Sequence, residues 1–371
     1  MINHPIFQPI PLWNRSLKNR TVVAPMSRVS ADADGVATDE MVDYYTSFAK
    51  GAFSVIITEG LYTDNFASQS YVFQPGMVTT KHIESWKKIT DVVHKHHALI
   101  IAQLMHGGAI SQYQKSTIAP SPIQPKGVKL ASYGGSGAFS IPKPMTLQDI
   151  EQVKEGFITA AINAYKAGFD GIELHAANGY LLDQFLTPEL NIRQDHYGGN
   201  IENRYRIVAE IISGIKQQVP KHFILGLRIS EGKVNDLAYR WEKGIEAAKE
   251  LAEQIKRSAP DYIHVAVQTG EWERDSFYNE NTSLASVMRS TTHIPIIANG
   301  GLHNLDKAEK ALNDNHADLL SIGKAALADP HWPIKTMNYQ PIIPFHKNML
   351  WTKATISHTR NVLARLCSET T

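Results

Sequence analysis

Short apolar runs, rich in β-branched residues, recur along the chain and alternate with longer segments in which apolar residues are spaced three or four positions apart. The first pattern is typical of buried strands and the second of amphipathic helices. Eight strands and eight helices in alternation predict a parallel (β/α)8 TIM barrel. The expected strands are Thr21–Ala24, Ser54–Thr58, Leu99–Leu104, Gly171–His175, Phe223–Ile229, Tyr262–Val267, Ile294–Ala298 and Asp318–Ile322. The expected helices span residues 38–50, 81–97, 147–167, 202–219, 241–257, 282–290, 305–315 and 330–337.

The alternating pattern predicts a single domain over residues 1–371, with the barrel at about 20–337 and a C-terminal tail at 338–371. Two segments lie outside the alternation. Before the first strand, Pro9, Pro11 and Asn14 predict a short N-terminal hairpin over the bottom of the barrel. After strand three, residues 107–145 form a long excursion rich in Gly, Pro and Ser. We expect this excursion to cover part of the pocket, because it follows a strand end on the catalytic face of such barrels.

The composition is typical of a protein that binds small molecules. The chain is 43% hydrophobic, and 37 basic against 36 acidic residues give a net charge of +1. This balance offers no electrostatic attraction to nucleic acid or to a membrane surface. A single cysteine excludes an internal disulfide framework, and the chain has neither an apolar leader nor 18 consecutive apolar residues. We therefore expect a cytoplasmic protein with a small-molecule substrate and no nucleic-acid or membrane partner.

Three residues at the end of the fourth strand form the most informative cluster in the sequence. His175 and Asn178 are three positions apart, and Tyr180 follows two positions later. An imidazole and an amide at this spacing can donate two hydrogen bonds to one oxygen, and a nearby phenol can deliver a proton. The set suits the polarisation of a carbonyl or nitro group. A core histidine followed by an Asn-Gly turn is the structural alternative.

The 34 residues from Gly171 to Arg204 resemble the signature of the Old Yellow Enzyme family, FMN-dependent ene-reductases built on a (β/α)8 barrel. The similarity extends over Ala24–Arg28, Gln74–Met77, Gln103–His106 and Ala328–Pro330. The resemblance implies that NADH or NADPH reduces FMN, which then passes a hydride to the β-carbon of an enone, enal or nitroalkene. It also implies the catalytic roles: His175 and Asn178 hold the activating oxygen of the substrate, and Tyr180 protonates the α-carbon.

The same resemblance implies an FMN site at the carboxyl ends of the strands. Ser27 would bond the pyrimidine carbonyl region, and the amide of Gln103 would read the pyrimidine edge. Arg228 would place a cation beside the ring atoms that become anionic on reduction. Residue chemistry agrees for Arg228, because a guanidinium in a buried strand needs an anion or several acceptors. The expected cofactor contacts are Pro25, Met26, Ser27, Gly60, Gln103, His175, Arg228, Asn299, Gly300, Gly301, Gly323 and Lys324.

The phosphate and substrate ends of the expected site depart from the family pattern. Glycine-rich turns after strands seven and eight would expose backbone N–H groups to the phosphate, with Lys324 where the family commonly has arginine. Tyr71 aligns with a tyrosine that lies over the substrate. Met105 replaces an aromatic residue and predicts a roomier, more adaptable pocket. The expected substrate contacts are thus His175, Asn178, Tyr71 and Met105.

Two alternatives come from other classes of protein. Glu173 and His175 alternate onto one face of a strand, and His94, His96 and His97 cluster in sequence, which is compatible with a metal-dependent barrel lyase or hydrolase. The histidine cluster ends a helix, where a solvated face is the simpler interpretation, and we expect no metal. The second alternative is a flavin-binding protein without catalysis.

Overall fold

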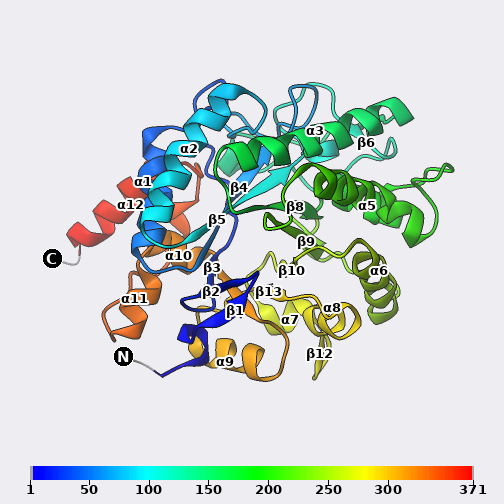
Figure 1. Ribbon diagram of the computed structural model, residues 1–371. Coiled ribbons are helices and arrows are strands. Elements are labelled where there is room, and N and C mark those ends of the chain that lie inside the picture. The colour runs from blue at the N-terminus through cyan, green and yellow to red at the C-terminus, as the bar shows by residue number, and fades with distance from the viewer. Residues whose placement is uncertain (1–2, 370–371) are drawn as a thin grey trace.

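The protein is a closed parallel barrel of eight strands, seen in a computed structural model that describes residues 3–369 (Figure 1). Each strand pairs in parallel with its two neighbours, and the circular order is β10-β13-β14-β3-β4-β5-β8-β9. The (β/α)8 prediction is confirmed. The barrel strands are β3 (Thr21–Val23), β4 (Val55–Tyr62), β5 (Leu99–Met105), β8 (Gly171–Asn178), β9 (Ile224–Lys233), β10 (Tyr262–Val265), β13 (Ile296–Asn299) and β14 (Leu319–Ile322).

The expected helices surround the barrel, and their starts follow local capping chemistry. The side chain of Thr146 accepts a hydrogen bond from the Asp149 N–H in a reciprocal capping box, and Asn200 caps the next long helix in a similar way. These outer helices are α1 (Asp39–Lys50), α2 (Thr80–Lys95), α3 (Leu147–Lys166), α5 (Ile201–Gln218), α6 (Ile245–Ser258), α8 (Leu284–Thr292), α9 (Leu305–Asn313) and α11 (Trp332–Met337). Among the residues described, no helix is long and apolar enough to span a bilayer.

Among the described residues, four α-helices and four short strands were not expected. The sequence pattern did not reveal the helices because three of them are only five or six residues long and one lies in the tail. They are α4 (Leu181–Leu186), α7 (Trp272–Ser276), α10 (Lys324–Ala328) and α12 (Ile356–Glu369). The additional short strands are β6 (Ile118–Ala119), β7 (Lys143–Pro144), β11 (Phe277–Asn279) and β12 (Thr282–Ser283).

Three barrel strands are longer than their apolar runs indicated. β4, β8 and β9 continue past their predicted ends to Tyr62, Asn178 and Lys233. The polar side chains in these extensions are buried: the Glu59 carboxylate, for example, accepts hydrogen bonds from the backbone N–H groups of Arg28 and Val29 at 2.8 and 3.1 Å. The extensions carry the chain past the barrel rim and position the site residues.

The predicted hairpin closes the bottom of the barrel. β1 (Ile10–Leu12) and β2 (Arg15–Leu17) pair antiparallel around Trp13 and Asn14, which both have positive φ as two-residue hairpin turns require. Ile10 and Leu17 are buried against the first residues of the barrel strands, including Val55, Ile101, Ile224 and Leu319.

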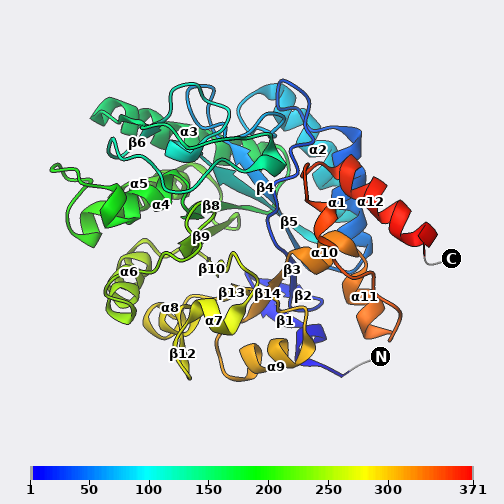
Figure 2. The same cartoon turned by 180° about the vertical axis from the view of Figure 1, so that it is seen from behind.

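The excursion and the tail both reach the top of the barrel. Within residues 107–145, Ala131–Tyr133 form a turn of 3-10 helix that brings Tyr133 to the cavity described below. The tail helix α12 lies beside α1 in both views (Figures 1 and 2). Arg28 attaches it to the barrel, because its Nη2 donates to the Thr355 carbonyl at 2.8 Å and to the Thr359 hydroxyl.

Candidate active site

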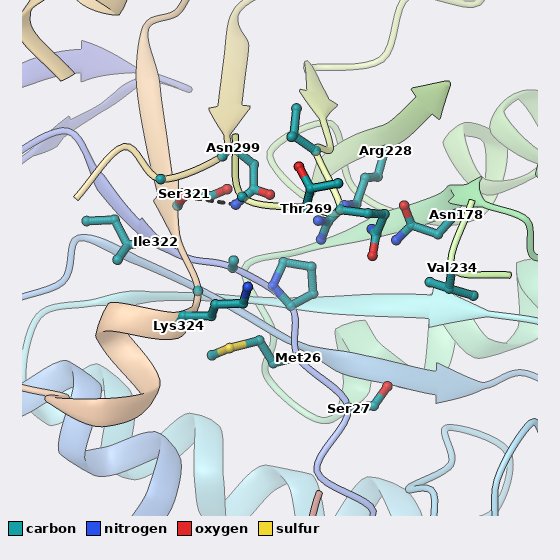
Figure 3. Close-up of a pocket in the computed structure, with 18 of the residues that line it drawn as sticks. Met26, Ser27, Asn178, Arg228, Val234, Thr269, Asn299, Ser321, Ile322 and Lys324 are labelled. Carbon is teal, nitrogen blue, oxygen red and sulfur yellow. Dashed lines mark hydrogen bonds between the residues drawn. The ribbon is translucent and has the colours of Figure 1, made fainter. Parts of the chain in front are cut away.

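A cavity of about 420 Å³ opens at the carboxyl ends of the barrel strands. Seven of the eight barrel strands, or the loops that follow them, supply its lining, which is the placement that TIM-barrel chemistry requires. In Figure 3, Asn178 and Val234 lie on one side of the cavity, and Lys324 and Met26 lie on the other. The expected residues that line it are Pro25, Met26, Ser27, Gln103, Met105, His175, Asn178, Tyr180, Arg228, Asn299, Gly300, Gly301, Gly323 and Lys324.

Two expected contacts do not line the cavity. Gly60 lies behind Met105, and a Cβ added to it would come within 2.6 Å of the Met105 sulfur. Tyr71 is buried behind Tyr180, and the two phenol oxygens are 2.7 Å apart. In this structure the side chains of Met105 and Tyr180 lie between these two residues and the cavity, and contact of Gly60 or Tyr71 with a ligand stays a prediction.

His175 and Asn178 are brought together by a turn at the end of β8. Asn178 has a left-handed φ of 67°, and its N–H donates to the Ser230 hydroxyl at 2.8 Å. This conformation brings Asn178 Nδ2 to 3.5 Å from His175 Nε2. The two nitrogens are close enough for one ligand oxygen to contact both. His175 Nδ1 and Asn178 Oδ1 are buried without a hydrogen-bond partner among the described residues.

The protonation states of the cluster suit neutral hydrogen-bond donors. Burial and the Arg228 cation hold the pKa of His175 well below its usual range, so the imidazole is neutral at pH 7. Burial raises the pKa of Tyr180, an effect that the hydrogen bond with Tyr71 partly offsets. Tyr180 therefore keeps its proton at neutral pH. The centroid of its ring lies 4.8 Å from that of the His175 ring.

Arg228 is a buried cation without an ion-pair partner among the described residues. Its side chain lines the cavity and is 4% exposed, and its Nε has no hydrogen-bond partner among the described residues. No carboxylate of the described residues lies within ion-pair distance, 4 Å, of the Arg228 guanidinium. Burial lowers the pKa of Arg228, while the Glu173 carboxylate opposes that shift. A ligand with electron-rich atoms would satisfy the guanidinium, as the flavin ring does when it becomes anionic.

The opposite end of the cavity suits a phosphate. Gly300 and Gly301 have φ values of 130° and 72°, which only glycine adopts without strain. A Cβ at Gly301 would also lie 2.5 Å from the Gly270 carbonyl oxygen. Lys324 lines the same end, and none of the described acidic residues forms an ion pair with it. These residues fit the terminal group of a mononucleotide, and Arg228 fits its ring.

Two residues of the metal hypothesis, His94 and Glu173, are bound to other protein groups. His94 Nε2 lies 2.8 Å from Asp170 Oδ2. The Glu173 carboxylate accepts hydrogen bonds from Gln103, Tyr262 and His264. In the described part of the chain, no three His, Cys, Asp or Glu side chains are grouped to hold a metal ion.

Several residues of the lining were not anticipated. Tyr133 comes from the excursion, Val234 from the segment after β9, and Leu350 from the tail. Their apolar character gave no functional signal, since loops place such residues only through tertiary packing. Ser321 could have been found, because it is a polar residue one position inside the end of a predicted barrel strand.

The barrel and its cavity define the class of protein as a TIM-barrel flavin oxidoreductase. The model of the NADH:flavin oxidoreductase / NADH oxidase family matches residues 5–341, and the chain belongs to that family. The resemblance to the Old Yellow Enzyme family is thereby confirmed. The protein is an FMN-dependent enzyme, and a nicotinamide cofactor is its reductant.

Individual relatives support this assignment over most of the chain. Putative 12-oxophytodienoate reductase 5 from Oryza sativa subsp. japonica is 31% identical over 91% of this chain and 88% of its own length. NADH oxidase from Thermoanaerobacter brockii is 30% identical over 89% of this chain, which spans 50% of that relative. The old yellow enzyme homologue from Zymomonas mobilis superposes with a TM-score of 0.81 at 27% identity, covering 95% of this chain and 99% of that one. Morphinone reductase in complex with tetrahydroNAD gives 0.83 at 27% identity, covering 96% and 97%.

Proposed function

We propose that the enzyme reduces activated alkenes, namely enones, enals and nitroalkenes, with electrons from NADH or NADPH. The observation that carries this proposal is the pair of nitrogens, His175 Nε2 and Asn178 Nδ2, that lie 3.5 Å apart beside the Tyr180 phenol. A relative from Leishmania infantum, 30% identical over 88% of this chain, is described as a probable flavin mononucleotide-dependent alkene reductase.

Different groups of cavity residues would bind different parts of FMN. Ser27 and Gln103 would bond the pyrimidine part of the ring, Arg228 would face its electron-rich edge, and Pro25 and Met26 would border it. Gly300, Gly301, Gly323 and Lys324 would hold the phosphate, with Asn299 leading into that turn. When bound, FMN supplies the two-electron chemistry, accepting a hydride from the nicotinamide and giving one to the alkene. Gly60 would support this site from behind Met105.

The protein supplies orientation, polarisation and a proton. His175 and Asn178 donate hydrogen bonds to the carbonyl or nitro oxygen, which draws electron density from the β-carbon. Tyr180 then gives its proton to the α-carbon. Tyr71, 2.7 Å from the Tyr180 oxygen, can donate to that oxygen as the charge of the phenolate develops. Met105 adapts the wall to substrates of different shape.

Replacement of Tyr180 by phenylalanine tests the proposal. The variant should keep the rate of flavin reduction by the nicotinamide, because that step takes no proton from the phenol. Reduction of an enone should slow by about 10²–10⁴-fold, the usual contribution of a positioned general acid. Stopped-flow absorbance measures the two half-reactions separately.

The control is Tyr113→Phe, which removes an exposed phenol outside the cavity lining and should leave both half-reactions unchanged. Enone reduction at the wild-type rate in Tyr180→Phe would show that another group delivers the proton. If the wild-type flavin is reduced by NADH or NADPH but passes no electrons to enones or nitroalkenes, the substrate assignment is wrong.

A further inference from the structure

The carboxylate of Glu173 lies inside the barrel, beneath the cavity, and has no role in the proposed reaction. Glu173 occupies the middle of β8 and is fully buried. Its Oε1 accepts a hydrogen bond from Gln103 Nε2 at 2.8 Å. Its Oε2 accepts from the Tyr262 hydroxyl at 3.1 Å and lies 2.9 Å from His264 Nδ1. Three neighbouring side chains thus converge on one buried anion.

The network has a single arrangement of hydrogens. Burial opposes ionisation of Glu173, but the hydrogen bonds from His264 and Gln103 and the charge of Arg228 outweigh it and lower the pKa of the carboxyl. An ionised carboxylate only accepts hydrogen bonds, so His264 must donate through Nδ1. Burial and Arg228 lower the pKa of His264, which leaves the imidazole neutral. Its Nε2 therefore accepts from the Ser321 hydroxyl, 2.8 Å away.

This network determines what two cavity residues can offer a ligand. Gln103 lines the cavity, and with Nε2 bound to Glu173 its amide has one preferred orientation. β8 and β9 pair in parallel with Glu173 opposite Gly226 and His175 opposite Arg228, so Arg228 lies on the neighbouring strand two positions beyond Glu173. Burial lowers the pKa of Arg228, and the Glu173 carboxylate opposes that shift. Coulomb interactions of this kind remain strong over several ångströms in a buried region. The Glu173 carboxylate is thus placed to act on the Arg228 guanidinium through space.

We propose that Glu173 is a positioning residue of the cofactor site, which balances the charge of Arg228 and fixes the orientation of the Gln103 amide. The proposal rests on FMN as the occupant of the cavity but not on the identity of the oxidising substrate. Arg228 favours the electron-rich, reduced form of the ring, and the Glu173 anion moderates that preference. Removal of the anion should therefore make the cofactor easier to reduce.

The test is the midpoint potential of the FMN bound to Glu173→Gln, measured by equilibrium dye titration without substrate. The ratio of the affinity for reduced FMN to that for oxidised FMN should be at least tenfold higher in the variant than in wild type. This change raises the midpoint potential of a two-electron couple by about 30 mV. Tyr262→Phe is the matched control, because it removes one hydrogen bond to Glu173 and keeps the charge. It should shift the potential by less than half as much. An unchanged or lower potential in Glu173→Gln, or an equal shift in the control, overturns the proposal.

A second comparison decides the case in which Glu173→Gln does not fold. Loss of the anion leaves Arg228 buried without a counter-ion, whereas Glu173→Gln combined with Arg228→Met removes both charges. Circular dichroism of the purified full-length chains with added FMN measures the melting temperature. The double variant should regain at least half of the loss, and failure to do so would assign Glu173 to packing alone. Neither readout depends on alkene turnover, so both remain decisive if the proposed substrate is wrong.

Discussion

The lining of the cavity contains buried polar atoms that the described chain leaves unpaired. Nδ1 of His175, Oδ1 of Asn178 and Nε of Arg228 are buried around the cavity, and each lacks a hydrogen bond within the described chain. An unsatisfied buried polar group costs about 1–3 kcal/mol. Three of them around one cavity lower the stability of the protein by itself. The substrate contacts that we propose use the other polar atom of each side chain, Nε2 of His175 and Nδ2 of Asn178. The Tyr180 phenol, by contrast, is already paired with Tyr71.

At this scale we predict the effect of His175→Ala on the binding of a phenol. The anionic oxygen of a bound phenolate would accept from both His175 and Asn178, and the loss of one charge-assisted bond costs about 1.5–3 kcal/mol. Affinity should therefore fall by about 10- to 150-fold. Titration of the long-wavelength charge-transfer absorbance of the enzyme–phenol complex measures it.

His106→Ala serves as the control, because His106 is also buried at a strand end but does not line the cavity. It should leave the phenol affinity within twofold while the melting temperature reports any general loss of fold. Equal affinities of His175→Ala and wild type would show that other residues bind the phenolate oxygen.

Among the elements, the junction of β8, α4 and β9 positions Asn178 and Tyr180, the residues proposed to act on the substrate. Asn178 ends β8 and Tyr180 precedes α4, so one turn carries both. The Gly179 N–H donates to Asp183 Oδ2 at 2.6 Å, and Lys233 Nζ lies 2.9 Å from the same oxygen. Both members of this ion pair are almost completely buried. The extension of β9 to Lys233 therefore fixes the turn through Asp183.

We predict that Lys233→Met weakens this junction. Removal of one partner of a buried ion pair leaves the other charge uncompensated and costs about 3–5 kcal/mol. The free energy of unfolding should fall by that amount, and enone reduction should slow because Tyr180 loses its fixed position. Urea denaturation and stopped-flow absorbance measure the two effects.

The double variant Lys233→Met with Asp183→Asn removes both charges and keeps an acceptor for the Gly179 N–H. It should recover most of the stability. If the single and double variants are equally unstable, packing of the lysine side chain rather than its charge supports the turn.

For the whole molecule, stability and chemistry lie at opposite ends of the barrel. The hairpin of β1 and β2 covers the first residues of the strands, while the cavity opens beyond their last residues. Leu17 is 4% exposed within the apolar cluster at the closed end. The two ends are connected through the barrel wall and not through shared side chains of the hairpin and the cavity lining.

Leu17→Ala should accordingly lower stability and leave the chemistry intact. Truncation of a buried leucine costs about 2–5 kcal/mol, through lost burial and the space left behind. Urea denaturation should detect this loss, while FMN content and the rates of both half-reactions stay within twofold of wild type. Ser16→Ala, at an exposed position of the same hairpin, should change stability by less than about 0.5 kcal/mol. A large loss of turnover in Leu17→Ala would show that the two ends are coupled.

The sequence by itself determined the barrel and most of the cavity. Apolar periodicity depends on neighbouring residues alone, and parallel strands bring their carboxyl ends to one rim, so Ser27, Gln103, His175 and Arg228 could be expected there. Polar strand ends were harder to predict, since Glu59 and Lys233 extend their strands only because distant partners bury them.

Only the tertiary structure decided which side chains face the cavity and which support it. Tyr71 and Gly60 are displaced from the lining by Tyr180 and Met105, a matter of packing between segments that no local pattern encodes. Glu173 meets Gln103 across 70 positions of sequence and His264 across 91. Such contacts arise when the barrel closes, because burial then forces each polar group to find its partner in space rather than along the chain.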